Sequence, residues 1–359
     1  MRDIWYLVLP LIISALITPV VKQIGYRLDA FAQMNERTVH HGKIVRIGGV
    51  AIYLAFIITM ALYVKTDMAM NGILVGSTIM FIGGLVDDLV NLKPLYKFSF
   101  QVVAAIVLIA SGVTLDVIRL PLGITINMGV VSFIVTFFWI TGITNAVNLI
   151  DGLDGLCGGI SVIILTVIAM LAVIEGRGDV EMIALILVGA TLGFLIYNAH
   201  PASIFMGDCG ALFLGFIISA ISLLGFKSST IMTLALPLLL LALPIIDTLS
   251  AILRRTLKGH KFSEADKSHI HHLLMNKFGH KNTVIIMCIV TALFGLTAYV
   301  YMINKGIGLI SLFVIMLAVD LFIEGSGMIS DKYHPILSVS RRIIRRLTRK
   351  KTITDSDRT

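Results

Sequence analysis

The chain has 359 residues, of which 57% are hydrophobic and 14% are charged, and its formal net charge is +8. A soluble protein carries about 25% charged residues to cover its surface, so this composition excludes an ordinary water-soluble enzyme. Nothing in the sequence resembles a groove-reading module, which argues against nucleic acid as the partner of the positive charge. The apolar runs are long enough to cross a bilayer, which takes roughly 20 helical residues. These features predict a polytopic membrane protein.

The hydrophobic pattern predicts eleven transmembrane helices. In chain order they span approximately residues 4–24, 47–64, 71–86, 98–114, 129–147, 157–174, 181–197, 209–226, 230–253, 284–303 and 307–324. The first run lacks a small-residue cleavage site followed by a soluble domain, so we expect a retained span rather than a signal peptide. The predicted fold class is an all-α polytopic integral membrane protein. It would have a transmembrane domain over residues 1–324 and a basic cytoplasmic tail over 325–359.

The connections between these helices differ in charge. When they alternate across the membrane, one side holds segments 25–46, 87–97, 148–156, 198–208 and 254–283, together with the tail. With Lys22 counted at its helix end, that side carries 23 of the 29 Lys and Arg, and it also carries all nine histidines. The positive-inside rule places this side in the cytoplasm. We therefore expect the N-terminus outside and the C-terminus inside.

The polar clusters of the chain all fall on this predicted cytoplasmic side. The first is Asp87-Asp88 at the end of the third helix, followed by Lys93 and Lys97. Adjacent carboxylates repel each other unless a cation or a metal offsets their charge. Mg²⁺ takes few protein oxygens and completes its shell with water and phosphates. The pair is therefore interpreted as part of a Mg²⁺ site, with a solvated helix end as the alternative.

A second cluster, Asn148, Asp151 and Asp154, lies between two long apolar runs. A charge at the centre of a membrane helix costs on the order of 2.5–3.5 kcal/mol, so a chain does not keep such groups there without a use. Their spacing of three places them on one face if the segment is helical. Gly152 and Gly155 allow the backbone to approach a ligand closely. We interpret this stretch as an active site at a membrane face.

A third segment, from Tyr197 to Gly210, places Asp208 between two glycines at the start of the eighth helix. A carboxylate at that position stabilises a helix N-terminus through the helix dipole, which is the structural alternative. We favour a fixed metal ligand.

The long loop after the ninth helix contains His269, His271 and His272. Zinc is not favoured, because a zinc site needs four well-separated ligands and no Cys pair lies nearby. Clustered Arg, Lys and His donors suit a diphosphate, and the first cytoplasmic segment adds Arg37 and Arg46. These residues predict an anion site.

Carboxylates for a metal, cations for phosphates and the lack of a soluble domain together indicate phosphoryl transfer between a soluble donor and a lipid. Such transfer depends on in-line positioning and charge neutralisation rather than on covalent chemistry. The chain contains no Gly-rich phosphate loop with Lys-Ser/Thr, which argues against ATP hydrolysis.

Four motifs occur in order along the chain: Asp87-Asp88, the Asn-x-x-Asn-x-x-Asp-Gly-x-Asp-Gly run that ends at Gly155, Phe205-Met-Gly-Asp208, and His269-Ile-His-His272. Together they resemble the bacterial polyprenyl-phosphate N-acetylhexosamine-1-phosphate transferases. The likeness runs from about Arg37 to His272. The His-Ile-His-His form is similar to the branch that starts teichoic acid linkage units, enterobacterial common antigen and the O-antigen of lipopolysaccharide. It is less similar to the related phospho-MurNAc-pentapeptide translocases of peptidoglycan synthesis.

The resemblance implies a reaction in which undecaprenyl phosphate and UDP-N-acetylglucosamine (UDP-GlcNAc) give undecaprenyl-diphospho-GlcNAc and UMP. This would be the first membrane step of a cell-envelope polysaccharide, in the bacterial cytoplasmic (inner) membrane. It implies Mg²⁺ as the cofactor, with Mn²⁺ as a substitute, and a site that faces the cytoplasm. Membrane lipids and the two substrates are the expected partners, and a homodimer stays open.

The resemblance also implies roles for single residues. Asp208 would be the first Mg²⁺ ligand, with Asp88 beside the metal, and Asp87 would hold or deprotonate the acceptor phosphate. Lys97 matches a diphosphate-contacting lysine. The nucleotide pocket would comprise Asn148, Asp151, Asp154, Asn198 and Phe205, with Phe205 stacked on uracil. The donor diphosphate or sugar would be held by His269, His271 and His272, and Arg37 and Arg46 would add substrate contacts.

The acidic motif has Asn91 where the family commonly has Asp, so we assign Asn91 no metal.

The sequence leaves two other readings open. The peptidoglycan branch, with UDP-MurNAc-pentapeptide as its donor, is the second enzymatic reading. A secondary transporter is the third, since Asp247, Asp320 and Glu324 are acids within apolar runs. A transporter would gather such groups near the bilayer midplane in two corresponding halves, and we find no clear internal repeat.

Overall fold

The computed structural model describes residues 2–32, 43–65, 67–119, 125–225 and 270–325. Within these ranges the chain forms the following helices: α1 Arg2–Arg27, α2 Gly49–Tyr63, α3 Met68–Val90, α4 Pro94–Ala110, α5 Val131–Ile150, α6 Leu156–Ile174, α7 Gly178–Asn198, α8 Gly207–Gly225, α11 Ile270–Phe278, α12 His280–Ile303 and α13 Lys305–Gly325.

Seven helices in the described ranges are long and apolar enough to cross a membrane: α1, α3, α5, α6, α7, α8 and α12. Three shorter apolar helices accompany them: α2, α4 and the Lys305–Val319 part of α13. The prediction of a helical polytopic membrane protein is therefore confirmed. Ten of the expected spans coincide with helices. The remaining one, the predicted ninth helix over residues 230–253, lies outside the described residues. The total number of spans and the sidedness of the termini stay predictions.

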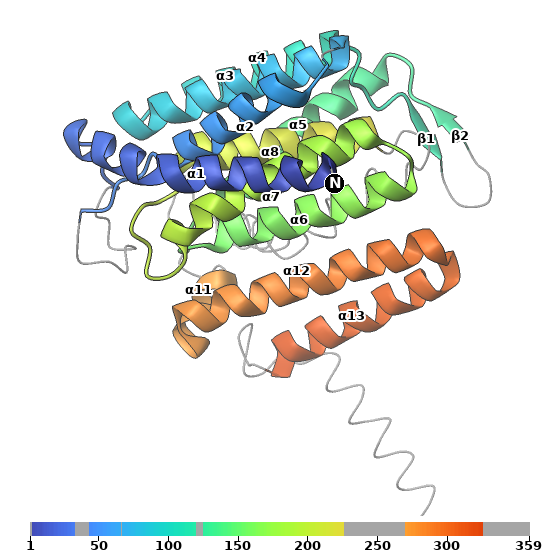
Figure 1. The fold of residues 1–359 in the computed structure, drawn as a ribbon. Coiled ribbons are helices and arrows are strands. Elements are labelled where there is room, and N and C mark those ends of the chain that lie inside the picture. The colour runs from blue at the N-terminus through green and yellow to red at the C-terminus, as the bar shows by residue number, and fades with distance from the viewer. Residues whose placement is uncertain (1, 33–42, 66, 120–124, 226–269, 326–359) are drawn as a thin grey trace, which may run out of the picture.

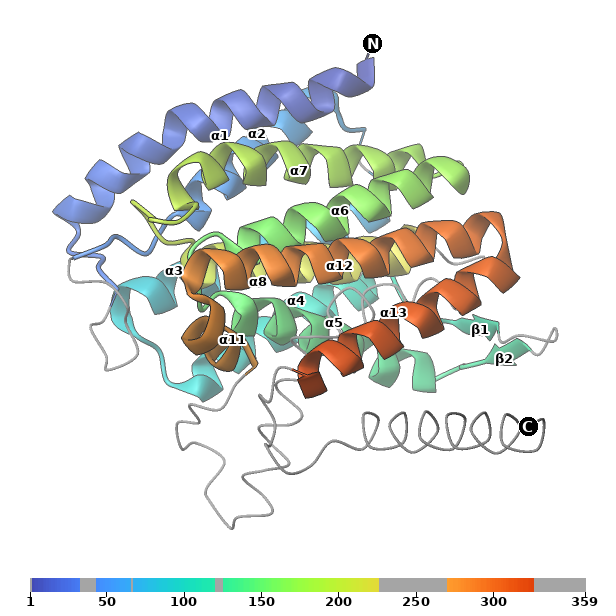
Figure 2. The same ribbon diagram turned by 90° about the horizontal axis from the view of Figure 1, so that it is seen from below.

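The helices α1 to α8 form one bundle, and α12 and α13 form a hairpin beside it (Figures 1 and 2). The centre of the bundle is α8, which packs against α3, α5 and α2. Its side chains are almost all buried, including Phe213 and Phe216. The hairpin joins the bundle through contacts between α12 and α6.

Helices α3 and α8 approach closely because glycines line their contact. A Cβ at Gly84 would clash with the Asp208 carbonyl oxygen at 2.5 Å and the Cys209 Cα at 2.6 Å, and Gly76 lies against the Phe216 ring. Small residues at such positions allow membrane helices to pack backbone to backbone. This packing brings the C-terminal end of α3 against the N-terminal end of α8.

Two helix boundaries differ from the sequence prediction in ways that matter for the site. Helix α3 starts after Asp67, whose side chain accepts a hydrogen bond from Met70 N at 2.7 Å. It runs past the predicted end at residue 86 to Val90, and Asn91 is its left-handed C-cap. The acidic pair therefore lies in the last turns of α3 rather than after it. Helix α4 starts at Pro94 instead of residue 98, as expected for a proline in the first helical turn. Lys97 is consequently held in a helix rather than in a loop.

A short antiparallel ribbon was not predicted. Strand β1, Val117–Arg119, pairs with β2, Thr125–Asn127, in the connection between α4 and α5. The strands are only three residues each, too short for a hydrophobic period to distinguish them from a loop.

Candidate active site

Three carboxylates meet where α3 ends and α8 begins. Asp87 and Asp88 come from α3 and Asp208 from the first turn of α8. Each offers a carboxylate oxygen, and these oxygens lie within 4.8 Å of one another. Asp87 and Asp88 are buried, whereas the Asp208 side chain keeps 21% of its surface exposed. Asp88 and Asp208 are 120 residues apart in the sequence, and the fold brings them together.

The backbone around Asp208 is fixed by the segment that precedes α2. Phe205 N donates to Val45 O, Gly48 N donates to Phe205 O and Gly49 N donates to Met206 O, at 2.8–2.9 Å. Residue 207 follows this short ladder with φ +73° and lies against the Arg46 carbonyl and the Asp88 carboxylate. Only glycine adopts that conformation without strain and leaves room for both neighbours.

The Asp88 carboxylate is saturated by protein donors. Its Oδ1 accepts from Asp208 N at 3.0 Å and from Arg46 Nε at 3.0 Å, and its Oδ2 accepts from Cys209 N at 2.9 Å. Two of these donors are N–H groups of the first turn of α8, which have no partner within their own helix. Asp88 therefore anchors the start of α8 and fixes the position of the Asp208 side chain.

Two cations balance the carboxylates. Lys97 Nζ lies 3.0 Å from Asp87 Oδ2 and also contacts Asp208 Oδ2. Arg46 pairs with Asp88 and reaches Asp87 Oδ2 at 3.5 Å. Its remaining nitrogen donates to Asn91 Oδ1 at 3.2 Å, so Asn91, which we had assigned no metal, orients an arginine instead. Sequence analysis placed both cations among the substrate-binding residues, and both border the carboxylate cluster.

A fourth acid, Asp151, follows the C-terminus of α5. Loss of solvent around this carboxyl group raises its pKa to about 8, and the charges of Asp208 and Asp88 act in the same direction. The backbone N–H of Gly207 offsets part of this effect. Three clustered carboxylates, with a further acid close to them, fit a divalent cation with oxygen ligands.

The two predicted asparagines reach the site in different ways. Asn148 Nδ2 donates to Asp208 Oδ1 at 3.1 Å, so it borders the carboxylate cluster directly. Asn198 is buried, and its amide accepts from Gly155 N at 3.1 Å and donates to Ile204 O at 2.9 Å. Asn198 therefore connects the loop before α6 with the segment that leads to Asp208.

An amide pair joins α4, the helix that carries Lys97, to α5. Gln101, one turn after Lys97 in α4, exchanges two hydrogen bonds of 2.9 Å with Asn145 of α5. Asn145 also donates to Thr141 O at 2.8 Å. The sequence singled out Asn145 as a polar residue in the motif, but it gave no sign that Gln101 was its partner, because the two come from different helices.

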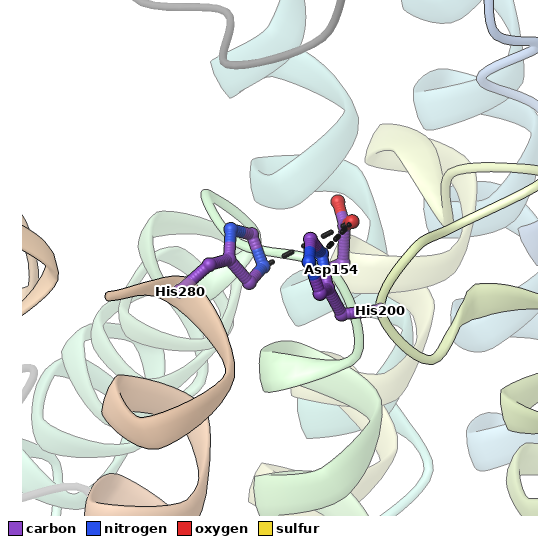
Figure 3. Close-up of side chains that lie close together, drawn as sticks. All are labelled: Asp154, His200 and His280. Atoms are coloured by element: carbon purple, nitrogen blue, oxygen red, sulfur yellow. Dashed lines mark hydrogen bonds and ion pairs between the residues drawn. The ribbon is translucent and has the colours of Figure 1, made fainter. Parts of the chain in front are cut away.

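A second polar group lies on the other face of the loop before α6 (Figure 3). Asp154 Oδ2 accepts from Ala202 N at 3.1 Å and lies 2.9 Å from His200 Nδ1. His280 Nε2 lies 3.9 Å from the same oxygen, and the rings of the two histidines stack with centroids 4.2 Å apart. Sequence analysis assigned Asp154 to the nucleotide pocket and did not connect it with either histidine.

The remaining predicted residues are only partly described. Phe205 is half-buried, and its backbone belongs to the ladder before α8. His271 and His272 lie in the first turn of α11. Arg37 and His269 lie outside the described residues, as does Asp247.

Comparison with known proteins agrees with this arrangement. Residues 70–226 match the model for glycosyl transferase family 4, a range that contains all four acids of the site. The chain is 37% identical, over 94% of its length and 96% of the relative's, to a probable undecaprenyl-phosphate N-acetylglucosaminyl 1-phosphate transferase of Bacillus subtilis. It is 32% identical to a decaprenyl-phosphate N-acetylglucosaminephosphotransferase of Mycobacterium tuberculosis, over 77% of this chain and 76% of the relative's.

A more distant relative belongs to the other branch. The phospho-N-acetylmuramoyl-pentapeptide-transferase of Streptococcus uberis is 30% identical over 63% of this chain and 74% of the relative's. The Bacillus subtilis and Mycobacterium tuberculosis N-acetylglucosamine transferases match more of this chain, 94% and 77%. The chain belongs to glycosyl transferase family 4 and, within it, to the polyprenyl-phosphate N-acetylhexosamine-1-phosphate transferases.

Proposed function

We propose that the protein transfers N-acetylglucosamine-1-phosphate from UDP-GlcNAc to undecaprenyl phosphate, and that the products are undecaprenyl-diphospho-GlcNAc and UMP. The observation that carries this proposal is the likeness to the Bacillus subtilis protein over nearly the whole of both chains. The convergence of Asp87, Asp208 and Lys97 supports it, since phosphoryl transfer depends on fixed charges around the reacting oxygens.

Mg²⁺ is the cofactor we propose, and Mn²⁺ would serve because it prefers the same oxygen ligands. Asp208 and Asp87 would hold the ion, since both carboxylates contact Lys97 and the Asp208 side chain keeps 21% of its surface exposed. Asp88 is better suited to fixing Asp208, because its oxygens are already engaged by three N–H donors of the protein. When bound, such an ion neutralises phosphate charge that builds up as the bond to the leaving group breaks.

The chain's own groups would orient the acceptor. A phosphate oxygen of the lipid attacks the β-phosphorus of the donor, and the bond to UMP breaks. Because the second pKa of a phosphate monoester is about 6, the acceptor is already anionic near neutral pH. Lys97, between Asp87 and Asp208, supplies the positive charge that holds an anion beside the carboxylates. Asp87 would then position the acceptor rather than remove a proton from it.

The donor would lie toward the loops that follow α5 and α7. Asn148 faces Asp208 directly, and Phe205 stays our proposal for the stacking partner of uracil. Asn198 and Asp154 would shape this pocket through their contacts with the loops. The histidines His269, His271 and His272, together with Arg37, stay proposed contacts of the diphosphate or sugar.

We propose that this end of the bundle faces the cytoplasm of a bacterial inner membrane. The excess of Lys and Arg on that side supports the orientation, and nucleotide sugars are made in the cytoplasm. The two domain boundaries, at residues 324 and 325, stay proposals as well, because the tail lies outside the described residues.

The test is UMP release from purified protein incubated with undecaprenyl phosphate, Mg²⁺ and one of three donors: UDP-GlcNAc, UDP-GalNAc or UDP-MurNAc-pentapeptide. We expect UMP with UDP-GlcNAc only, and none after EDTA treatment. Asp208→Asn should lower the rate by a factor of about 10²–10³, the usual cost of losing a charge that stabilises the transition state. The control is Asp29→Asn, which alters an exposed acid in the connection after α1.

UMP from the pentapeptide donor alone would move the protein to the peptidoglycan branch. Folded protein that released UMP from none of the donors would contradict the proposal. Near-normal activity of Asp208→Asn would leave the reaction standing and overturn the metal assignment.

A further inference from the structure

We propose that His280 is a positioning residue for the donor site. With His200 it holds the Asp154 carboxylate, and in this way it links the loop before α6 to the segment that carries His271 and His272. The inference rests on the proposed function, and it adds a residue and a role that lie outside the four sequence motifs.

The contacts around Asp154 come from three separate parts of the chain. Asp154 lies in the loop between α5 and α6, His200 follows α7, and His280 is the first residue of α12. Figure 3 shows both histidine rings beside the Asp154 carboxylate. Oδ2 of that carboxylate is 2.9 Å from His200 Nδ1 and 3.9 Å from His280 Nε2. With 5% of its surface exposed, Asp154 is held by the protein and does not face open solvent.

His280 is placed by the turn between two helices. Helix α11 ends at Phe278, Gly279 N donates to Met275 O at 2.9 Å, and α12 begins at the next residue. Gly279 has φ +77°, a conformation that favours glycine at the end of a helix. The first turn of α11 contains His271 and His272. A short rigid helix therefore separates the histidine motif from the point at which His280 is held.

The same contact lies where the hairpin meets the bundle. Helix α12 packs against α6, and α6 starts at Leu156, two residues after Asp154. The loop of Asp154 also carries Asp151, which faces the carboxylates of the site. Asp154 therefore connects the hairpin to a loop whose other acid borders the predicted metal site.

A carboxylate shared by two stacked histidines, with one ring 2.9 Å and the other 3.9 Å from Asp154 Oδ2, accounts for this group better than a second metal centre does. One ligand atom each from Asp154, His200 and His280 lies within 4.8 Å of the others, close enough for a metal in principle. However, the two imidazole rings are stacked, with an angle of 20° between their planes. The lone pair of an imidazole nitrogen lies in the plane of its ring, so near-parallel rings direct their lone pairs alongside each other rather than toward one ion. Stacking and a shared carboxylate instead hold both rings in place.

The experiment compares wild type with His280→Ala, His280→Gln and Lys281→Ala in the UMP assay. Glutamine can place an amide nitrogen near the position of Nε2, and Lys281 is the exposed neighbour that serves as the matched control. We expect His280→Ala to raise the KM for UDP-GlcNAc by about tenfold, with kcat within about threefold of wild type and the KM for undecaprenyl phosphate unchanged. His280→Gln should recover part of the donor KM, and Lys281→Ala should match wild type.

A second readout does not depend on catalysis. Backbone hydrogen exchange over residues 151–156 should be faster in His280→Ala than in Lys281→Ala, because the loop loses one of its anchors. The inference is overturned if the donor KM and the exchange of this loop are unchanged in His280→Ala. It is also overturned if kcat and thermal stability fall and both KM values rise together in His280→Ala, without recovery in His280→Gln, which would indicate a general packing role. If wild type released no UMP, the proposed function would fail, and the exchange measurement would still decide whether His280 anchors the loop.

Discussion

At the scale of single residues, Lys97 joins the two acids that belong to different helices. Its ammonium group contacts Asp87 of α3 and Asp208 of α8. A lysine shared between two carboxylates lowers the repulsion between them. The same group is positioned to hold the phosphate oxygens of a substrate, because the Lys97 side chain keeps 28% of its surface exposed. It is therefore the cation whose loss should affect the reaction most.

The first prediction is that Lys97→Met lowers kcat/KM for UMP release by a factor of about 10²–10³, the usual range for a lost electrostatic contact in the transition state. Lys93→Met, an exposed lysine just before α4, is the control and should stay near wild type. Steady-state kinetics with both substrates varied measures the effect. Equal activities of the two variants would show that Lys97 has no contact with the reacting groups.

The second prediction concerns Asp151 and pH. Its pKa is about 8 in the folded protein and about 3.9 in an unfolded chain. Between these values the folded state binds more protons than the unfolded state, so this group lowers the free energy of unfolding as pH rises from about 4 to 8. In the Asp151→Asn variant this side chain cannot ionise, so its contribution to the free energy of unfolding does not change with pH. In EDTA, the thermal midpoint of the variant should therefore rise relative to wild type as pH increases from 5 to 8.

The control for this measurement is Asp29→Asn, and its thermal midpoint plotted against pH should stay parallel to that of wild type. Parallel curves for Asp151→Asn and wild type would show that Asp151 is ionised in the folded protein across this pH range. Added Mg²⁺ should reduce the difference, since a bound cation favours the charged form of nearby carboxylates.

The site residues show which parts of an active site can be predicted from sequence alone. Asp87, Asp88, Asp208, Asn148 and Lys97 were predicted because charged and amide groups are costly in apolar surroundings and therefore conspicuous. The structure brings these side chains close together, and their roles stay predictions. The histidine partners of Asp154 were not predicted, because spacing along the chain carries no information on contacts between residues far apart in the sequence.

At the scale of elements, the amide pair between α4 and α5 joins the helix that carries Lys97 to the helix that carries Asn148. Each of the side chains of Gln101 and Asn145 both donates to and accepts from the other, at 2.9 Å. An unpaired amide in such surroundings costs about 1–3 kcal/mol, whereas removing both partners costs less. The pair therefore behaves as a unit, and neither member can be lost alone without a penalty.

The third prediction is a double-mutant cycle on this pair. Gln101→Leu and Asn145→Leu should each lower the free energy of unfolding by about 1–3 kcal/mol. The double variant should lose less than the sum of the two, with a coupling energy of roughly 0.5–3 kcal/mol. Chemical denaturation in detergent measures all three. Additive losses would mean that the two amides are not coupled to each other.

The helices themselves were largely predictable. Runs of apolar residues at these lengths have few alternatives to a membrane helix, because every backbone polar group must be satisfied within the segment. The errors fall at the ends, where capping by Asp67 and Pro94 overrides hydrophobicity, and at α11 and the β-ribbon, which are too short to show a period. The predicted bounds at residues 86 and 98 placed the acidic pair and Lys97 in a connection, whereas the structure holds both on helices.

At the scale of the whole molecule, the site is built from helix ends that alternate in direction. Asp87 and Asn148 lie near the C-terminal ends of α3 and α5, whereas Lys97 and Asp208 lie in the first turns of α4 and α8. Antiparallel neighbours bring these ends to one face of the bundle without any long connection. In the sequence prediction, six Lys and Arg fall outside the cytoplasmic side: Arg2, Lys65, Arg119, Arg177, Lys227 and Lys305.

The fourth prediction follows from this asymmetry. Single cysteines at Val130 and Lys281, both exposed and at opposite ends of the bundle, are introduced into a catalytically active background in which Cys157, Cys209 and Cys288 are replaced. A membrane-impermeant maleimide should label the Val130→Cys variant in intact cells. It should label the Lys281→Cys variant only after the membrane is opened, since excess positive charge keeps that end in the cytoplasm. The reverse labelling would place the active site outside the cell, where no UDP-sugar is made, and would contradict both the orientation and the donor.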